Sequence, residues 1–286
     1  VPGVDLFLGV VSHTRSRFAH NQGSSGFPAQ LTETLRGRGM SVELKIEVRD
    51  FFSETLETLD PSVVQESLSE QLRLEGAWAR YTNSRHRLSA RQKLRLLALR
   101  VVRQWRRINA PPLQSMVRLL NIELSHLSLL ESGLASGSPW IMIVEDDGEC
   151  SDIDDCAAGL AGFMTAAPRE VAFANLSESF DVRELGLGEL LRDSDISWQG
   201  DIGRSIARSE RPVTNTVCAM IYRSDFAARL VQDFRDQGLL PVVPIDWKLN
   251  STLMRMFAAG ILTHESCMWV IPAPITQLSM HTGTTS

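Results

Sequence analysis

The first 48 residues switch between strand and helix periodicity, and this switch most constrains the fold. Residues 4–12, VDLFLGVVS, are almost entirely apolar, as in a buried strand. Residues 28–39, PAQLTETLRGRG, have helical spacing, with Pro28 near the first turn and Gly39 just past the end. Residues 41–48, SVELKIEV, alternate as a strand does. A strand, a helix and a strand in this order predict an α/β domain with a parallel sheet.

The remaining sequence predicts more elements of both kinds. Helices are expected within 51–109 and at about 113–132, 153–165, 224–238 and 245–260, and strands at 140–144, 170–176, 214–223 and 267–274. Residues 181–212, rich in Gly and Asp, are expected to be mostly irregular, and the small, polar tail 275–286 to be mobile. Without internal repeats or a long linker, the chain is expected to form a single domain, 1–286.

Composition narrows the class of protein. Hydrophobic residues make up 43% of the chain and charged residues 22%, as in a globular protein. No apolar run approaches the roughly 20 residues of a membrane-spanning helix, and the first residues lack the basic segment of a signal peptide, so a cytoplasmic location is expected. The four cysteines form no CxxC pair, which favours free thiols over a zinc site or disulfides.

The stretch PWIMIVEDDGECSD, residues 139–152, places the carboxylates Glu145, Asp146 and Asp147 directly after an apolar strand. In open α/β sheets, ligands bind at the carboxyl ends of strands. Three adjacent carboxylates need a cation to stay ionised together, and their oxygens suit Mg²⁺ or Mn²⁺. The alternative is that the acidic residues cap the next helix, which fits Ser151 and Asp152 better.

Several segments resemble glycosyltransferase family 25, the lipopolysaccharide and collagen galactosyl- and glucosyltransferases. NIELSHLSLLESGL, residues 121–134, followed by the Glu-Asp-Asp strand resembles the family's Ser-His helix and acidic motif. Further matches, in the family's order, are SHTRSRF, TNTVCAMIYRSDFAARLV, PVVPIDWKLN and PAPITQLS. The resemblance implies a GT-A fold, a Rossmann-like, mostly parallel mixed sheet flanked by helices, with residues 52–112 as a helical insertion.

The resemblance also implies ligands and roles. The donor is a nucleotide diphosphate sugar, with a UDP-sugar favoured, and Mn²⁺ or Mg²⁺ holds its diphosphate. Asp147 is implied as the direct metal ligand, while Glu145 or Asp146 faces the ribose or the metal's water shell. The loop after the first strand is implied to hold the nucleotide, and its candidates are Ser12, His13, Thr14, Arg15 and Arg17. Arg guanidinium groups match phosphate geometry, although a surface loop with two Arg needs no such role.

Family 25 enzymes invert the anomeric centre, so a carboxylate must take the proton of the acceptor hydroxyl. Asp246, in VPIDW, is the candidate base, and a helix N-terminus there is expected to lower its pKa. The alternative is that Asp246 is an ordinary N-cap.

Two histidines have uncertain roles in the sequence. His126 lies three residues after Glu123, on the same helical face, and suits either donor binding or a packed structural position. His281, in the tail, is a candidate third metal ligand, because some GT-A enzymes take one from a C-terminal His; the alternative is an inert surface residue.

Residues 76–122 contain 11 Lys and Arg and no Asp or Glu, which leaves 18 basic against 34 acidic residues elsewhere. Around 85–107 two neighbouring helical stripes are expected, an apolar one of Leu94, Leu97, Val101, Trp105 and Ile108 and a basic one of Lys93, Arg100, Arg103 and Arg107. This pattern suits peripheral contact with an anionic membrane on its inner face, or a helix packed on the body or at a homodimer interface. Nucleic acid is not expected, because no matching motif is present and the body is acidic.

The sequence therefore favours a metal-dependent inverting glycosyltransferase that moves a hexose to a glycan, a glycolipid or another hydroxyl acceptor. Two alternatives stay open at this point: a catalytically inactive glycosyltransferase-like protein that serves in binding or assembly, and a metal-dependent phosphoryl-transfer or hydrolytic enzyme that uses the same acidic cluster.

Overall fold

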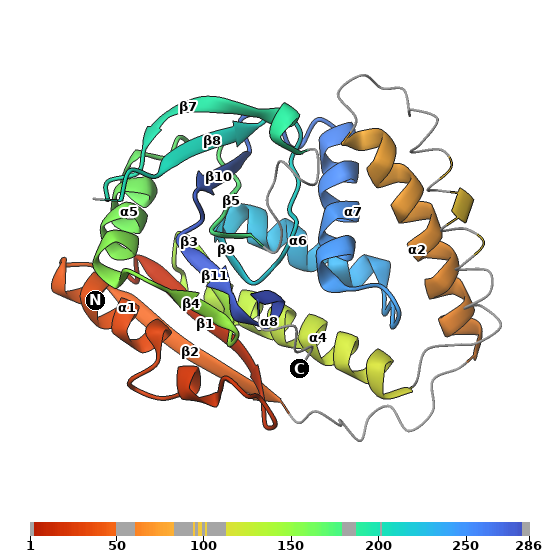
Figure 1. The fold of residues 1–286 in the computed structure, drawn as a ribbon, viewed down its shortest axis with the longest axis horizontal. Coiled ribbons are helices and arrows are strands. Elements are labelled where there is room, and N and C mark those ends of the chain that lie inside the picture. The colour runs from red at the N-terminus through yellow and green to blue at the C-terminus, as the bar shows by residue number, and fades with distance from the viewer. Residues whose placement is uncertain are drawn as a thin grey trace.

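A computed structural model describes residues 3–49, 61–82, 94, 97–98, 101, 113–178, 187–200 and 202–281. An eight-stranded sheet forms its centre, in the spatial order β2-β1-β3-β9-β5-β10-β8-β7 (Figure 1). The strands are β1 (Leu6–His13), β2 (Val42–Arg49), β3 (Trp140–Glu145), β5 (Phe173–Asn175), β7 (Leu191–Ser197), β8 (Ser205–Ser209), β9 (Ala219–Arg223) and β10 (Cys267–Ile271).

Six of these eight strands point in one direction. β1 is parallel to both β2 and β3, and β5 is parallel to β10. The two reversed strands are β9, between β3 and β5, and β8, between β10 and β7. The expected α/β class with a mixed, mostly parallel sheet is therefore confirmed, and so is the opening strand, helix and strand.

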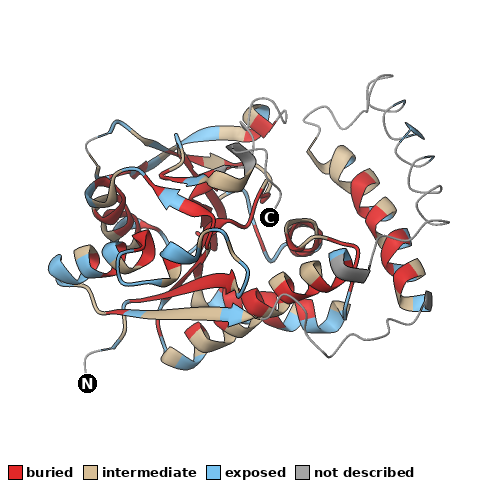
Figure 2. Ribbon diagram, turned by 60° about the horizontal axis from the view of Figure 1, so that its bottom comes forward, coloured by how far each residue is buried: buried red, intermediate tan, exposed pale blue. Residues whose placement is uncertain are grey.

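Helices cover both faces of the sheet (Figure 1). One face carries α1 (Phe27–Gly37) and α5 (Ile153–Ala166), and the other carries α4 (Leu113–Ser136) and α6 (Ser224–Gln237). Strand periodicity explains this division: Leu6 and Leu8 join the core under α1 and α5, whereas Phe7 joins the core under α4 and α6. Figure 2 shows the resulting buried centre.

Two further helices lie on the α4 and α6 side. α7 (Ile245–Ala258) packs against α4 and α6, and α2 (Pro61–Tyr81) packs against α7. The rings of Trp78 in α2 and Trp247 in α7 meet edge to face, with centroids 5.9 Å apart. α2 therefore supports the helix that begins at the expected Pro-x-Asp segment.

Two expectations were wrong. The segment 181–212, expected to be mostly irregular, contains β7, β8 and the 3-10 helix η3 (Leu187–Leu190). β7 is a largely exposed edge strand with a polar sequence, so it lacks the apolar signal of a buried strand.

The tail expected to be mobile is ordered as far as His281. β11 (Ile275–Gln277) pairs with β4 (Gly148–Cys150) and β6 (Ser177–Glu178) in a small second sheet, and α8 (Leu278–His281) follows it. Backbone pairing to β4 and β6, together with burial of Ile275, orders this segment and brings the tail beside the acidic residues.

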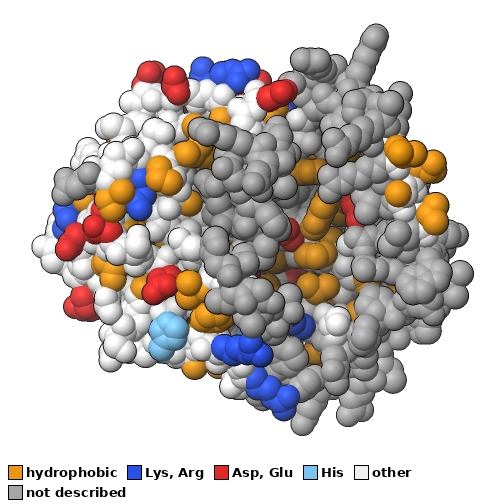
Figure 3. Space-filling model, viewed as in Figure 1, with side chains coloured by type: hydrophobic (Ala, Val, Ile, Leu, Met, Phe, Trp, Pro, Cys, Tyr) orange, Lys and Arg blue, Asp and Glu red, His pale blue; other side chains and the backbone are white. Residues whose placement is uncertain are grey.

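Most of the expected insertion 52–112, including most of 85–107, lies outside the described residues. Its described part contains α2 and helical positions at 94, 97, 98 and 101. Leu94, Leu97 and Val101 are 67%, 58% and 64% exposed. Figure 3 shows hydrophobic side chains at the right-hand edge, beyond α2. Among the described helices, none has the length and apolar character needed to cross a membrane.

Candidate functional site

The ends of β1 and β3 bring the predicted site residues together. Val11 is in register with Glu145, so Ser12 and His13 reach the same sheet edge as the three carboxylates. The backbone N–H of Asp146 donates to the Val11 carbonyl at 2.9 Å, and that of Glu145 donates to the Cys218 carbonyl at 2.7 Å. This edge is where parallel sheets bind ligands.

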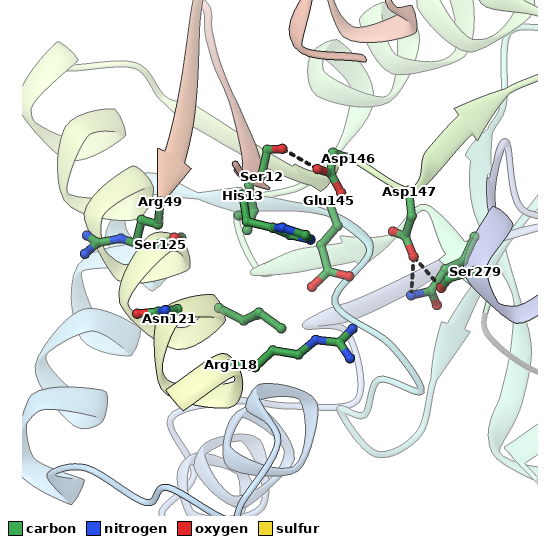
Figure 4. A pocket seen from close by; sticks show the side chains of 13 residues that line it. Ser12, His13, Arg49, Arg118, Asn121, Ser125, Glu145, Asp146, Asp147 and Ser279 are labelled. Atoms are coloured by element: carbon green, nitrogen blue, oxygen red, sulfur yellow. Dashed lines mark hydrogen bonds between the residues drawn. The ribbon is translucent and has the colours of Figure 1, made fainter. Parts of the chain in front are cut away.

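The three carboxylates do not form a single cluster, because successive side chains point in different directions (Figure 4). Asp146 turns back toward the N-terminal loop, where the Ser12 hydroxyl donates to its carboxylate. Gln22, in the 3-10 helix η1 (Ala19–Gln22), donates to the Ser12 oxygen at 2.6 Å. Asp146 and Ser12 are both buried and satisfied by this network. The geometry therefore ties Asp146 to the N-terminal loop, and its expected role beside the ribose or the metal stays a prediction.

The turn after β3 is held by hydrogen bonds from Asn21 and made possible by the glycine at position 148. The buried Asn21 donates from its side-chain amide to the carbonyls of Asp146 (2.8 Å) and Gly148 (3.0 Å). A Cβ at Gly148 would lie 3.0 Å from Val144 Cγ1 and 3.1 Å from the Glu145 carbonyl oxygen. Glycine at this position therefore lets the chain turn tightly enough for β4 to pair with β11.

Glu145 faces the cavity and contacts the histidine of the Ser-His helix. His126 Nε2 lies 3.3 Å from Glu145 Oε1, and the histidine is buried. Burial raises the pKa of the Glu145 carboxyl, the hydrogen bond from His126 opposes this shift, and the charges of Asp147 and Asp146 add to it. His126 thus acts on the site through Glu145 and does not line the cavity itself.

Asp147 turns toward the C-terminal segment. Its Oδ2 accepts hydrogen bonds from Gln277 Nε2 at 3.2 Å and from the Ser279 hydroxyl at 2.5 Å. The Cys218 thiol donates to Asp147 Oδ1 at 3.6 Å. Burial raises the pKa of this thiol well above its usual range, and the charge of Asp147 adds to the shift. Cys218 is therefore a protonated thiol.

One described set of side chains is close enough to hold a metal ion. Ligand atoms of Glu145, Asp147 and Cys218 all lie within 4.8 Å of one another. The two carboxylates suit Mn²⁺ or Mg²⁺, whereas a protonated thiol is a poor ligand for either ion. Asp147 is thus in place for the expected metal role, with Glu145 as its partner. The side chain of His281 lies outside the described residues.

A cavity of about 110 Å³, called the acidic cavity below, opens beside these residues (Figure 4). Five predicted site residues line it: Ser12, His13, Glu145, Asp146 and Asp147. The sequence reasoning missed six polar residues that also line it: Arg49, Arg118, Asn121, Ser125, Gln277 and Ser279. The residues from α4 are spaced as one helical face, 118, 121, 122 and 125, a signal that was present in the sequence.

Arg118 is the cation that extends into this space. Figure 4 shows its side chain running from α4 toward the side of the cavity where Glu145 and Asp147 lie. Burial lowers the pKa of His13, the Asp146 carboxylate opposes the shift, and the Arg118 charge adds to it. His13 is therefore neutral near pH 7, and Arg118 carries the positive charge.

The expected donor residues Thr14, Arg15 and Arg17 do not line the acidic cavity. They lie exposed in the turn after β1. The backbone N–H of Arg15 donates to His13 Nδ1 at 3.2 Å, which helps to shape this turn. The structure thus separates the loop candidates: Ser12 and His13 belong to the site, and the other three to the surface beside it.

A second cavity of about 270 Å³, called the Asp246 cavity below, adjoins the first. Both cavities are lined by Ile122, Glu145 and Gln277. Together their volumes fall within the range of about 300–1,000 Å³ that is typical of ligand sites. Of these two cavities, Asp246 lines only the second and Asp147 only the first.

Asp246 differs from its expectation in two respects. Pro244, not Asp246, is the N-cap of α7, so the alternative of an ordinary N-cap is wrong. Burial raises the pKa of Asp246 to about 6, backbone N–H groups partly oppose the shift, and the Glu145 charge adds to it. The expected lowering by the helix N-terminus is present but smaller than the effect of burial.

An ion pair fixes α7 against α4. Lys248, completely buried, donates to Glu123 and to the Gly238 carbonyl at 2.7 Å. Glu123 and His126 share a helical face, as expected, but they have different partners, Lys248 and Glu145. Since Asp246 lies two residues before Lys248, this pair also sets the position of Asp246 relative to α4.

No protein-family model matches the chain, and comparison with curated proteins found no match. The fold and the site define an α/β protein with two adjoining cavities at the carboxyl ends of its central strands.

Proposed function

We propose that the protein is a metal-dependent inverting glycosyltransferase with a GT-A-like arrangement. It transfers a hexose from a nucleotide diphosphate sugar, most favourably a UDP-sugar, to a hydroxyl group of a glycan, glycolipid or similar acceptor. One observation carries this proposal: the cavity at Asp147 and the cavity at Asp246 share Glu145 and Gln277. A donor in one cavity and an acceptor in the other would therefore meet beside Glu145.

The acidic cavity suits a diphosphate and a divalent cation together. Glu145 and Asp147 repel a phosphate by themselves, but they provide oxygen ligands for Mn²⁺ or Mg²⁺. When bound, that cation would neutralise charge on the departing diphosphate. Arg118 adds a guanidinium that can pair with phosphate oxygens. Sites with both carboxylates and a guanidinium match a ligand that is itself a metal-anion complex.

The Asp246 cavity supplies the base. In the proposed reaction the acceptor oxygen forms a bond to the anomeric carbon as the bond from that carbon to the diphosphate oxygen breaks. The acceptor proton passes to Asp246, and the bonding electrons leave with the diphosphate. With a pKa of about 6, Asp246 is ionised near pH 7 and is more basic than an ordinary Asp.

Thermal shift measurements test the proposal. UDP or GDP with Mn²⁺ or Mg²⁺ is expected to raise the melting temperature, and neither the nucleotide alone nor the metal alone is expected to match that rise. Asp147→Asn is expected to abolish the metal-dependent part. Asp154→Asn, an exposed carboxylate in the first turn of α5, is the matched control and is expected to behave as wild type. Absence of any nucleotide-dependent shift in wild type would reject the proposal.

A further inference from the structure

The two adjoining cavities differ in charge. Arg49 and Arg118 line the acidic cavity, whereas no Lys, Arg or His lines the Asp246 cavity among the residues that the structure describes. The ionisable side chains that do line it are those of Glu145 and Asp246, both carboxylates. Groups that could bind an anion are therefore confined to one half of the site.

The two described cations closest in sequence to lining residues of the Asp246 cavity, Lys248 and Arg118, do not line it. Lys248, two residues after Asp246, is completely buried and pairs with Glu123. Arg118 lies on α4 next to Leu119, but Arg118 lines the acidic cavity and Leu119 lines the Asp246 cavity. A phosphate or carboxylate placed beside Asp246 would thus meet two carboxylates without a compensating charge from the described lining residues.

The rest of the wall combines apolar surface with uncharged hydrogen-bonding groups. Leu119, Ile122, Val217 and Ile245 supply the apolar part, and α4 contributes the first two. This combination suits a ligand that has an apolar ring face and hydroxyl groups at its edge.

The polar part of the wall is fixed by hydrogen bonds. The Thr216 hydroxyl donates to Gln277 Oε1 at 3.2 Å and accepts from the Cys218 N–H at 3.1 Å. Gln277 Nε2 in turn donates to Asp147. The orientation of the Gln277 amide is therefore set by contacts on both sides, and the uncharged groups are held in place before a ligand arrives.

We propose that the Asp246 cavity binds an uncharged, hydroxyl-bearing ligand of monosaccharide size, and that it discriminates against phosphorylated or carboxylated versions of that ligand. The volume of about 270 Å³ corresponds to roughly nine water molecules at about 30 Å³ each, which is room for a sugar ring. The proposal rests on the transferase function, in which this cavity receives the acceptor. It names the acceptor class as a neutral glycoside.

Ligand-observed NMR with the full chain, in the presence and absence of UDP and Mn²⁺, tests this. The probes are methyl glucoside and methyl galactoside, the corresponding methyl uronides, glucose 6-phosphate and glucosamine. At least one neutral glycoside is expected to bind, and its anionic counterpart is expected to bind at least tenfold more weakly. Leu119→Trp, which fills the cavity from α4, is expected to abolish glycoside binding and to leave the UDP and Mn²⁺ thermal shift intact.

A variant without the Asp246 charge shows whether anionic ligands are excluded by charge or by the shape of the cavity. Asp246→Asn is expected to reduce the preference for the neutral ligand several-fold, whereas Asp193→Asn, an exposed carboxylate in β7, is expected to keep it. Equal or tighter binding of the anionic probes, binding of glucosamine alone, or no binding of any neutral glycoside would overturn the proposal. Glycoside binding without a metal-dependent nucleotide shift would reject the transferase function instead, so the two failures are distinguishable.

Discussion

Gln277 Nε2 donates to Asp147 Oδ2 at 3.2 Å, although 130 positions separate the two residues in the sequence. The pairing of β11 with β4 makes this contact, because it places Gln277 opposite Gly148, the residue after Asp147. Ser279 donates to the same oxygen. The C-terminal segment thus orients the carboxylate that we propose as the metal ligand.

Removing these donors is expected to weaken binding of UDP and Mn²⁺. A hydrogen bond to a charged group contributes about 1.5–3 kcal/mol, so Gln277→Ala together with Ser279→Ala is expected to raise the Kd at least tenfold in calorimetric titration. The control is Thr276→Ala, because Thr276 is exposed and directly precedes Gln277 in β11. An unchanged Kd in the double variant would show that Asp147 needs no orienting contacts.

Arg118 is expected to contact the diphosphate in place of the arginines that follow β1. Arg118 lines the acidic cavity, whereas Arg15 is exposed outside it. Arg118→Met keeps much of the side-chain volume and removes the charge, and it is expected to weaken UDP and Mn²⁺ binding at least tenfold. Arg15→Met is expected to bind as wild type. If Arg15→Met weakened binding more than Arg118→Met in the same titration, the phosphate would be bound by the loop after β1 instead.

Asp246 is expected to set the acidic limb of the activity profile. Its pKa of about 6 means that the base is ionised above that pH, so turnover is expected to fall about tenfold per pH unit below it. Asp246→Asn is expected to lower kcat at least a hundredfold at neutral pH, and this deficit is expected to shrink below about pH 6, where wild type loses its base as well. Initial rates with a neutral acceptor, measured across this pH range, check the pH dependence of wild type and the lower kcat of the variant. A near-normal kcat in Asp246→Asn would exclude this residue as the base.

The same pKa predicts a pH-dependent effect on stability. Because the folded-state pKa is raised from 3.8 to about 6, the folded protein binds the proton more tightly than the unfolded chain does. Burial of the charged carboxylate therefore lowers the unfolding free energy increasingly from pH 3.8 to about 6, and the full reduction is present above about pH 6. Asp246→Asn is expected to be more stable than wild type in urea unfolding at neutral pH, and this gain is expected to vanish below pH 3.8. A gain that is constant with pH would have another cause.

The central half of the fold was predictable because its strands are buried on both faces. β1 and β3 are continuous apolar runs, and the ends of both strands could be read from Ser12 and Glu145. The same reasoning failed for β7, an edge strand with polar residues, and for β11, whose order comes from pairing with a distant strand. Local periodicity carries no information about such pairing.

Within the site, the sequence indicated which residues would gather but not where each side chain would point. Adjacent carboxylates looked like one cluster, yet Asp146 turns to Ser12 and Asp147 to Ser279. The position of Arg118 depends on how α4 lies across β1 and β3, which is a tertiary property. Likewise, the burial that raises the pKa of Asp246 comes from elements remote in sequence.

The exposed stripe of Leu94, Leu97 and Val101 is expected to bind anionic membranes. These side chains are more than half exposed, and the sequence around them, residues 76–122, has 11 basic and no acidic residues. Replacing all three with Ser is expected to weaken binding to phosphatidylserine-containing vesicles at least a hundredfold, since each buried large apolar side chain contributes about 1.5–3 kcal/mol. Ile261→Ser, at a position 47% exposed, is the control. Unchanged sedimentation with vesicles would reject the membrane contact.

The buried pair of Lys248 and Glu123 is expected to show a strong asymmetry between single and double replacement. Lys248→Met leaves the Glu123 carboxylate buried without its partner, which is expected to cost about 3–5 kcal/mol of unfolding free energy. Burial already raises the pKa of Glu123 and Lys248 opposes that shift, so loss of the lysine also favours protonation of the carboxyl. Replacing both residues with Met removes the two charges together and is expected to restore most of the stability.

Urea unfolding at neutral pH measures this asymmetry. Arg73→Met provides the comparison, because Arg73 pairs with Glu70 on the surface of α2 and such exposed pairs contribute at most about 1 kcal/mol. If Lys248→Met costs no more than Arg73→Met, the buried pair does not hold α7 against α4. The double variant also tests positioning, because α7 carries both Lys248 and Asp246. If this variant is stable and keeps its affinity for UDP and Mn²⁺ but has a lower kcat, the pair positions Asp246 as well as stabilising the fold.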